Sequence, residues 1–231
     1  PGGSTTPNEP LRIMTDADTK PRYSRGEEIA NSLTHGIGML LSAAGLVLMA
    51  VFSAQRGDAR QVVGTAIFGA SLVFLYTAST LYHGIPSPSA KKTLRTLDHS
   101  AIFLLIAGTY TPFTLVSLRG PWGWTLFGVI WGAAAFGFIV QFTPLKRSRA
   151  LSLILYLAMG WAVVAAARPL RAAVPPRGIL LLLLGGLCYT GGVAFYLRRK
   201  LPYGHAVWHL FVLAGSVFHF FAVFLHVISP P

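Results

Sequence analysis

The chain contains seven apolar segments, each close to the length that a helix needs to cross a lipid bilayer. They cover residues 29–52, 62–82, 98–117, 122–142, 150–167, 179–196 and 205–228. About 20 mainly apolar residues in an α-helix reach across the hydrocarbon core. A backbone inside lipid must also satisfy its own hydrogen bonds, which a single helix does. We therefore predict an all-α integral membrane protein with seven transmembrane helices.

The composition agrees with a membrane protein and argues against nucleic-acid binding. Only 11% of the 231 residues are charged, and the mean hydropathy is +0.58, whereas about a quarter of a soluble domain is charged. The net charge is +12, but the Lys and Arg residues lie between the apolar segments, as in loops that border a membrane. We expect membrane lipids as partners and no nucleic acid; the sequence does not determine the oligomeric state.

The chain divides into two parts. Residues 1–25 are polar and rich in Pro, Gly, Ser and Thr, which predicts a disordered arm, whereas residues 26–231 form one membrane domain. Cys188 is the only cysteine, so no intrachain disulfide can form. Pro112 lies inside the third segment, where it predicts a kink.

The loop charges predict the orientation of the chain. Thirteen of the 19 Lys and Arg residues lie in the N-terminal arm and in the loops after the second, fourth and sixth segments. Positively charged loops stay in the cytoplasm. We therefore predict a multi-pass protein of the cell membrane (inner or plasma membrane) with a cytoplasmic N-terminus and an external C-terminus.

Four ionisable residues lie at the ends of apolar segments, and the predicted topology puts all of them on the cytoplasmic side: His83, Asp98, His205 and His209. The histidines at 205 and 209 are one helical turn apart, a spacing that chelates one ion, and His83 offers a third nitrogen. Three protein ligands with one open position are typical of a catalytic zinc site. Each residue alone is equally well explained as an interfacial side chain, but ionisable groups within membranes are costly and usually functional.

The residues around these positions form four short motifs. They are EEIANSLTHG (27–36), STLYH (79–83), LDHS (97–100) with AGTYTPF (107–113), and PYGHAVWH (202–209). Together, in this order and spacing, they resemble the hemolysin III-related bacterial branch of the progestin and adipoQ receptor superfamily, over residues 25–228. The resemblance implies seven helices and a cytoplasmic N-terminus.

The resemblance also implies the members of a zinc site. The implied ligands of Zn²⁺ are His83, His205 and His209. Asp98 is expected to hold the zinc-bound water, and Ser79 to face the same site from one turn before the first ligand. His99 stands where eukaryotic receptors of the superfamily usually carry an aromatic residue. It is either a partner of the site, a pH-sensitive neighbour or an interfacial residue.

Such a site suits a zinc-dependent hydrolase of lipid amides or esters, active in membrane lipid homeostasis. Asp98 would orient the water or act as general base, and Ser79 would bind an oxyanion or the water. Two other functions stay open: a receptor-like sensor with structural zinc, and a pore-forming hemolysin. The last is the weakest, because a secreted pore former must leave the cell, which seven apolar helices oppose.

Five further polar residues lie in apolar segments or directly before one. Glu28, Asn31 and His35 share one stripe of the first helix, and they belong either to the site or to ordinary contacts between helices. His219 and His226 are too far along the last segment to share the ion. We expect them to pair with other helices rather than to line a water-filled cavity.

Overall fold

The computed structural model describes residues 23–198 and 200–228, which form helices joined by short turns. Most of the predicted polar arm lies outside the described residues. The α-helices are α2 (Arg25–Arg56), α3 (Ala59–Gly84), α4 (Pro88–Pro112), α5 (Pro121–Val140), α6 (Arg149–Trp161), α7 (Ala167–Ala173), α8 (Pro176–Leu197) and α9 (Gly204–Val223). Four short segments accompany them: the π-helical η1 (Phe113–Ser117) and η4 (Phe224–Ile228), and the 3₁₀-helical η2 (Pro144–Arg147) and η3 (Ala162–Ala166). Seven helical stretches in the described part are long and apolar enough to cross a membrane, which confirms the predicted fold class.

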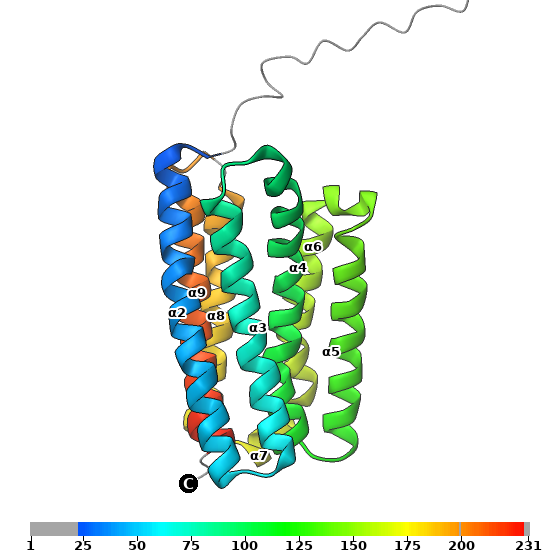
Figure 1. Ribbon diagram of the computed structural model, residues 1–231. Coiled ribbons are helices and arrows are strands. Elements are labelled where there is room, and N and C mark those ends of the chain that lie inside the picture. Colours follow the sequence, from blue (N-terminus) through cyan, green and yellow to red (C-terminus); the bar gives the residue numbers. More distant parts are fainter. Residues whose placement is uncertain (1–22, 199, 229–231) are drawn as a thin grey trace, which may run out of the picture.

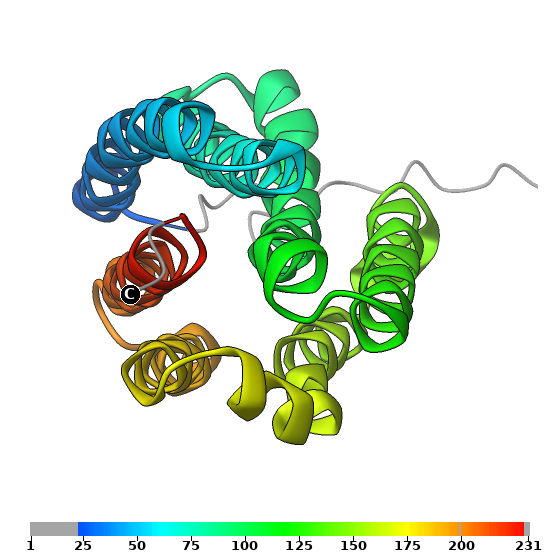
Figure 2. The same cartoon turned by 90° about the horizontal axis from the view of Figure 1, so that it is seen from below.

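The seven spans stand side by side and form a closed ring (Figures 1 and 2). Helices α2, α3 and α4 follow one another, α5 and α6 continue the ring, α8 comes next, and α9 packs against both α8 and α2. Helix α2 begins at one end of the bundle and α9 runs towards the other (Figure 1). The side of the membrane that each end faces stays a prediction.

Helix α2 turns its polar residues inward and its leucines outward. Asn31 and His35 are buried, whereas Leu33 and Leu40 are 62% and 67% exposed. The exposed leucines suit contact with lipid, and the buried amide and imidazole require polar partners inside the bundle. Ser24 begins the helix with a capping box, in which its side chain accepts a hydrogen bond from the Glu27 backbone. This helix therefore offers polar groups to its neighbours α3 and α9.

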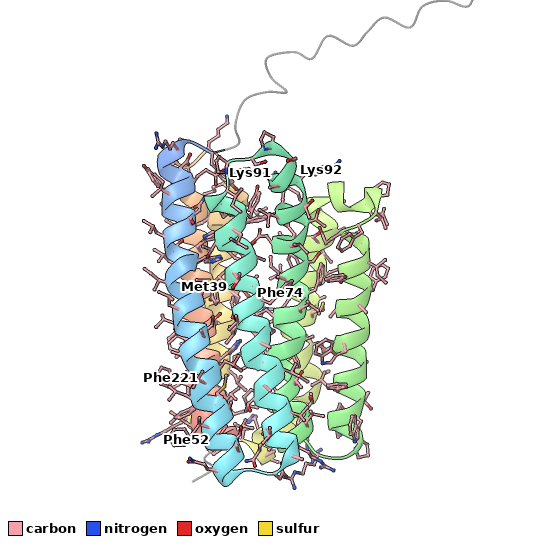
Figure 3. The ribbon with its side chains drawn as sticks, in the orientation of Figure 1. Met39, Phe52, Phe74, Lys91, Lys92 and Phe221 are labelled. Carbon is pink, nitrogen blue, oxygen red and sulfur yellow. The ribbon has the colours of Figure 1, made fainter. Side chains whose placement is uncertain are left out.

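The predicted start of the third span was wrong by ten residues. Helix α4 begins at Pro88, so Lys91, Lys92 and Arg95 lie on its first turns and not in a loop. Proline is favoured in the first helical turn, and Lys and Arg are good helix formers, but hydropathy detects only the apolar part. Asp98 consequently lies about 15 Å along the helix from its start, not at the helix end. Figure 3 labels both lysines at the end of the bundle where α2 begins.

The fifth span also continues further than predicted. Its final helix, α7, ends at Ala173 rather than at residue 167, so Arg168 and Arg171 are helical. Polar residues at a helix end carry no hydropathy signal, and helix propensity alone extends the helix there. All other bounds of the seven spans lie within four residues of the prediction.

Tyr110 compensates for an interruption in the fifth span, where α6 gives way to a 3₁₀ turn. Its hydroxyl lies 2.8 Å from the Met159 carbonyl oxygen and 2.9 Å from that of Gly160. The same hydroxyl accepts a hydrogen bond from the Val163 backbone N–H at 2.9 Å. Backbone groups freed inside a membrane must find such partners. The interruption is thus stabilised by a side chain from α4.

Pro112 lies where the third span changes its hydrogen bonding, at the position of the predicted kink. The α-helix ends at this residue and continues as a π-helix, and the proline has no N–H to donate to the preceding turn. Helix α3 approaches closely here: a Cβ on Gly64 would lie 3.0 Å from the Pro112 Cα. Glycine at this position permits the two helices to pack.

Candidate metal centre

Three histidines from two helices meet at the end of the bundle where α2 begins. His83 lies in the last turn of α3, and His205 and His209 lie on the first two turns of α9. One nitrogen of each ring can be chosen so that all three lie within 4.8 Å of one another. The His83 and His209 rings are buried, and the His205 ring is half-buried. The structure therefore brings together the three residues predicted as ligands.

The arrangement fits a metal ion with nitrogen ligands. In a tetrahedral zinc site with Zn–N bonds of about 2.0–2.1 Å, ligand nitrogens lie about 3.4 Å apart, and the separations here exceed that value by at most about 1.4 Å. The Nε2 atom of His83 is buried and has no hydrogen-bond partner in the described part of the chain. A buried nitrogen without a partner is costly, and a bound ion would remove that cost.

Helix α2 orients the His83 ring through a carboxylate. Glu28 Oε2 lies 2.6 Å from His83 Nδ1. An ionised carboxylate can only accept, so Nδ1 donates its proton and the lone pair of Nε2 remains available to a ligand. The other carboxylate oxygen accepts a hydrogen bond from Lys91 Nζ at 2.6 Å, and the same ammonium group donates to the Tyr82 carbonyl at 3.0 Å. The ring is therefore held by residues from three helices.

Helix α2 orients His209 in a similar way, with its backbone. The Nδ1 atom of His209 lies 3.2 Å from the Asn31 carbonyl oxygen and 3.2 Å from Thr34 Oγ1. A proton on Nδ1 again leaves Nε2 for a ligand. The His35 ring stacks on His209 with centroids 3.5 Å apart, and the Tyr23 ring stacks on His205 at 5.0 Å. Each of the three rings thus contacts the N-terminal part of the described chain.

Asp98 and Ser79 both lie in the interior beside the histidines. Asp98 is buried on α4, and its Oδ2 atom lies 3.3 Å from His99 Nδ1. Its side chain lines the same cavity as His205 and His209. Ser79 is buried one turn before His83 on α3, and its Oγ atom has no hydrogen-bond partner among the described residues. The His99 ring thus lies beside the Asp98 carboxylate, and the His99 carbonyl oxygen accepts a hydrogen bond from the Tyr156 hydroxyl at 2.8 Å.

An elongated apolar cavity of about 360 Å³ extends from the histidines into the bundle. Asp98, His205 and His209 lie on its wall at one end. Apolar side chains that line the remainder include Leu105, Phe113, Leu126, Leu157, Leu182 and Val193. Ligand pockets typically have volumes of about 300–1,000 Å³ and mainly apolar walls with a few polar groups. The cavity therefore suits an apolar chain with a polar group at the histidines.

His219 and His226 do not join the three histidines. His219 Nε2 lies 3.2 Å from the Leu182 carbonyl oxygen of α8, so it pairs with another helix as expected, and its side chain also lines the cavity. The His226 ring packs against α8, where a Cβ on Gly178 would lie 3.0 Å from it. Both residues belong to the contact between the last two spans.

The sequence pattern failed to identify several residues that contact the histidines. The stripe of Glu28, Asn31 and His35 pointed to the correct face of α2, but the pattern could not show that this face touches His83 and His209. Lys91 was assigned to a loop because it lies outside the apolar segment. Thr34 carried no signal of its own. A helical wheel of residues 27–36 places Thr34 on the side of Asn31, three residues away, which is the only hint that the sequence contains.

Comparison with known proteins identifies the family. The profile of the family described as haemolysin-III related matches residues 23–220, which includes all four motifs. The chain belongs to this family. Hemolysin-3 of Bacillus cereus is 45% identical over 215 residues, which cover 93% of this chain and 98% of that protein. The Hemolysin-3 homolog of Bacillus subtilis (strain 168) is 46% identical over 205 residues, covering 89% and 96%.

The similarity extends to mammals. The human monocyte to macrophage differentiation factor is 29% identical over 214 residues, which cover 89% of this chain and 86% of that protein. This relative fits the progestin and adipoQ receptor superfamily, so the resemblance stated from the motifs is confirmed. With its seven apolar spans, the chain is a multi-pass membrane protein of the haemolysin-III related family with a histidine cluster that could hold a metal ion.

Proposed function

We propose that this protein is a membrane-embedded, zinc-dependent hydrolase of lipid amide or ester bonds. The observation that carries the proposal is the convergence of three imidazoles at a long apolar cavity, whose wall contains two of them, His205 and His209, together with the buried carboxylate of Asp98. The residues that would hold zinc are His83, His205 and His209. Imidazole nitrogens suit zinc, whereas Mg²⁺ and Ca²⁺ prefer oxygen ligands.

The side chains around the histidines are suited to hydrolysis. When bound, zinc would polarise a carbonyl and make a water molecule acidic near neutral pH. Asp98 would accept the proton of the attacking water, since it is a buried carboxylate among imidazoles. Ser79 would donate a hydrogen bond to the oxygen on which negative charge develops, because its hydroxyl has no other acceptor among the described residues. The apolar cavity would hold the acyl chain.

The test is hydrolysis by the purified full-length chain. Reconstituted protein is incubated with a panel of ceramides, phospholipids and lysolipids, and released fatty acid is measured by mass spectrometry. We expect release that stops when a chelator removes zinc and returns when zinc is added back. No release from any lipid of the panel by zinc-loaded protein would contradict the proposal.

A sensor of membrane lipids with structural zinc is the second candidate, because the same cavity could bind a lipid without cleaving it. Zinc-loaded protein that retains a lipid but releases no fatty acid would favour it. The name of the Bacillus relatives, Hemolysin-3, suggests lysis. However, seven spans that bury polar groups inside the bundle oppose spontaneous transfer between membranes, so lysis is a poor candidate for the primary activity.

A further inference from the structure

A second, polar pocket lies at the same end of the bundle as the histidines. It measures about 430 Å³ and is formed by the starts of α2, α6 and α9 and by the end of α8 with the turn that follows it. Its wall contains three aromatic hydroxyls: Tyr23, Tyr196 and Tyr203. Residues from four separate elements thus surround one space above the interior.

The charged side chains of this pocket are mainly cationic. They are Arg149, Arg198, Lys200 and Glu27. The Glu27 carboxylate already accepts hydrogen bonds from the Ser24 N–H at 2.9 Å and the Tyr203 N–H at 3.1 Å. Among the described residues, no carboxylate forms an ion pair with Arg198 or Lys200. Among the residues that the structure describes, this pocket therefore carries more positive than negative charge.

The polar pocket and the apolar cavity meet at the metal centre. Tyr196 and His205 line both. A molecule with a polar end in the pocket and an apolar chain in the cavity would pass directly beside His205. Such a molecule is an amphiphile, and the cationic wall selects the charge of its polar end.

We propose that the polar pocket binds the phosphate headgroup of an anionic lipid whose acyl chain enters the apolar cavity. Guanidinium groups match phosphate oxygens with paired hydrogen bonds, and basic pockets between membrane helices bind anionic headgroups. Arg198 and Lys200, which have no carboxylate partner among the described residues, supply positive charge for a phosphate monoester. Binding of this lipid follows from the two pockets alone, whereas its role as the substrate rests on the proposed hydrolase function.

The test compares two triple variants in neutral detergent by native mass spectrometry. The pocket variant is R149Q/R198Q/K200Q. The control is R25Q/K92Q/R95Q, which removes the same charge at the same end of the bundle from residues that do not line the pocket. The probes are oleoyl lysophosphatidic acid, oleoyl lysophosphatidylcholine and inorganic phosphate, and zinc content checks that each variant is folded.

We expect the pocket variant to bind lysophosphatidic acid about 10- to 100-fold more weakly than the wild type, with binding of lysophosphatidylcholine unchanged. The control variant should bind both lipids as the wild type does. Equal losses in the two variants would assign the effect to general surface charge and overturn the proposal. Saturation by inorganic phosphate at the same concentration as the lipid would overturn the role of the acyl chain.

This result is independent of catalysis, because binding is measured and not turnover. Loss of lysophosphatidic acid binding in the pocket variant, without hydrolysis of any lipid by the wild type, would support the pocket and contradict the hydrolase. Hydrolysis of neutral and anionic lipids at equal rates by wild type and pocket variant would support the hydrolase and overturn the role of the anionic lipid as its substrate.

Discussion

The last span carries four histidines, and its two halves use them differently. At the start of α9, His205 and His209 lie beside α2 and α3, which contribute a third imidazole and the groups that orient it. Further along, His219 lies against α8, which offers a backbone carbonyl and a close glycine at 185. The histidines of both regions belong to the same helix, α9. The difference teaches that neighbouring helices, rather than histidines alone, make a cluster that could hold a metal ion.

The largest expected effect concerns Asp98, the buried carboxylate that lines the cavity with His205 and His209. Asp98→Asn keeps the volume of the side chain but removes the base, so we expect fatty-acid release to fall about 10²- to 10⁴-fold, with bound zinc unchanged. Asp58→Asn, at the other end of the bundle, is the matched control and should hydrolyse as the wild type does. Equal rates in Asp98→Asn and wild type would exclude the assigned base.

A second prediction tests the orienting role of α2. Replacing the partner of a metal-bound histidine typically lowers metal affinity about 10- to 100-fold, so we expect a loss of this size in Glu28→Gln, which weakens the hold on His83. The neighbouring Glu27 belongs to the helix cap, and Glu27→Gln should leave affinity unchanged although it lowers stability. Zinc affinity is measured by competition with a fluorescent chelator. A uniform loss in both variants would indicate damage to the helix rather than to the ligand.

The number of spans and the meeting of three histidines could be predicted from the sequence, the first from apolar length and the second from the motifs. The three histidines were expected to be close, and they are; Asp98 lines the same cavity as His205 and His209. The contact between Glu28 and His83 could not be predicted, since it joins residues 55 positions apart. Lys91 was missed because a charged first turn extends a helix beyond its apolar part. The two pockets also depend on the ring of helices, which no local pattern contains.

A third prediction concerns His219, in the later part of α9. His219→Leu removes the hydrogen bond to the Leu182 carbonyl, so we expect a loss of stability of about 0.5–1.5 kcal/mol with no change in bound zinc. Thermal unfolding in detergent and metal analysis on the same sample measure both. A loss of zinc in this variant would break the distinction between the two halves of the span.

The smallest expected effect concerns Asp58, which caps the start of α3 at the opposite end of the bundle. The pKa of Asp58 lies below its ordinary value of 3.8. The main cause is the hydrogen bond from the Gln61 backbone N–H, and the Arg60 backbone N–H and the Arg119 guanidinium lower the pKa further. A lowered pKa means that this carboxylate stabilises the fold above pH 3.8 and that the stabilisation disappears as the pH falls through the lowered value. We expect the unfolding temperature of Asp58→Asn to lie slightly below that of the wild type at pH 7 and to converge with it below pH 3.8. A difference that grows with acidity would contradict this role.

The central claim is that His83, His205 and His209 hold one zinc ion. Metal analysis of the purified chain by inductively coupled plasma mass spectrometry tests it most directly, with the wild type compared with His83→Ala, with the double variant His205→Ala/His209→Ala, and with His219→Leu. The account predicts about one zinc per chain in the wild type and in His219→Leu, as a three-ligand site requires, and almost none in the other two. Full zinc content in folded His205→Ala/His209→Ala protein would contradict it.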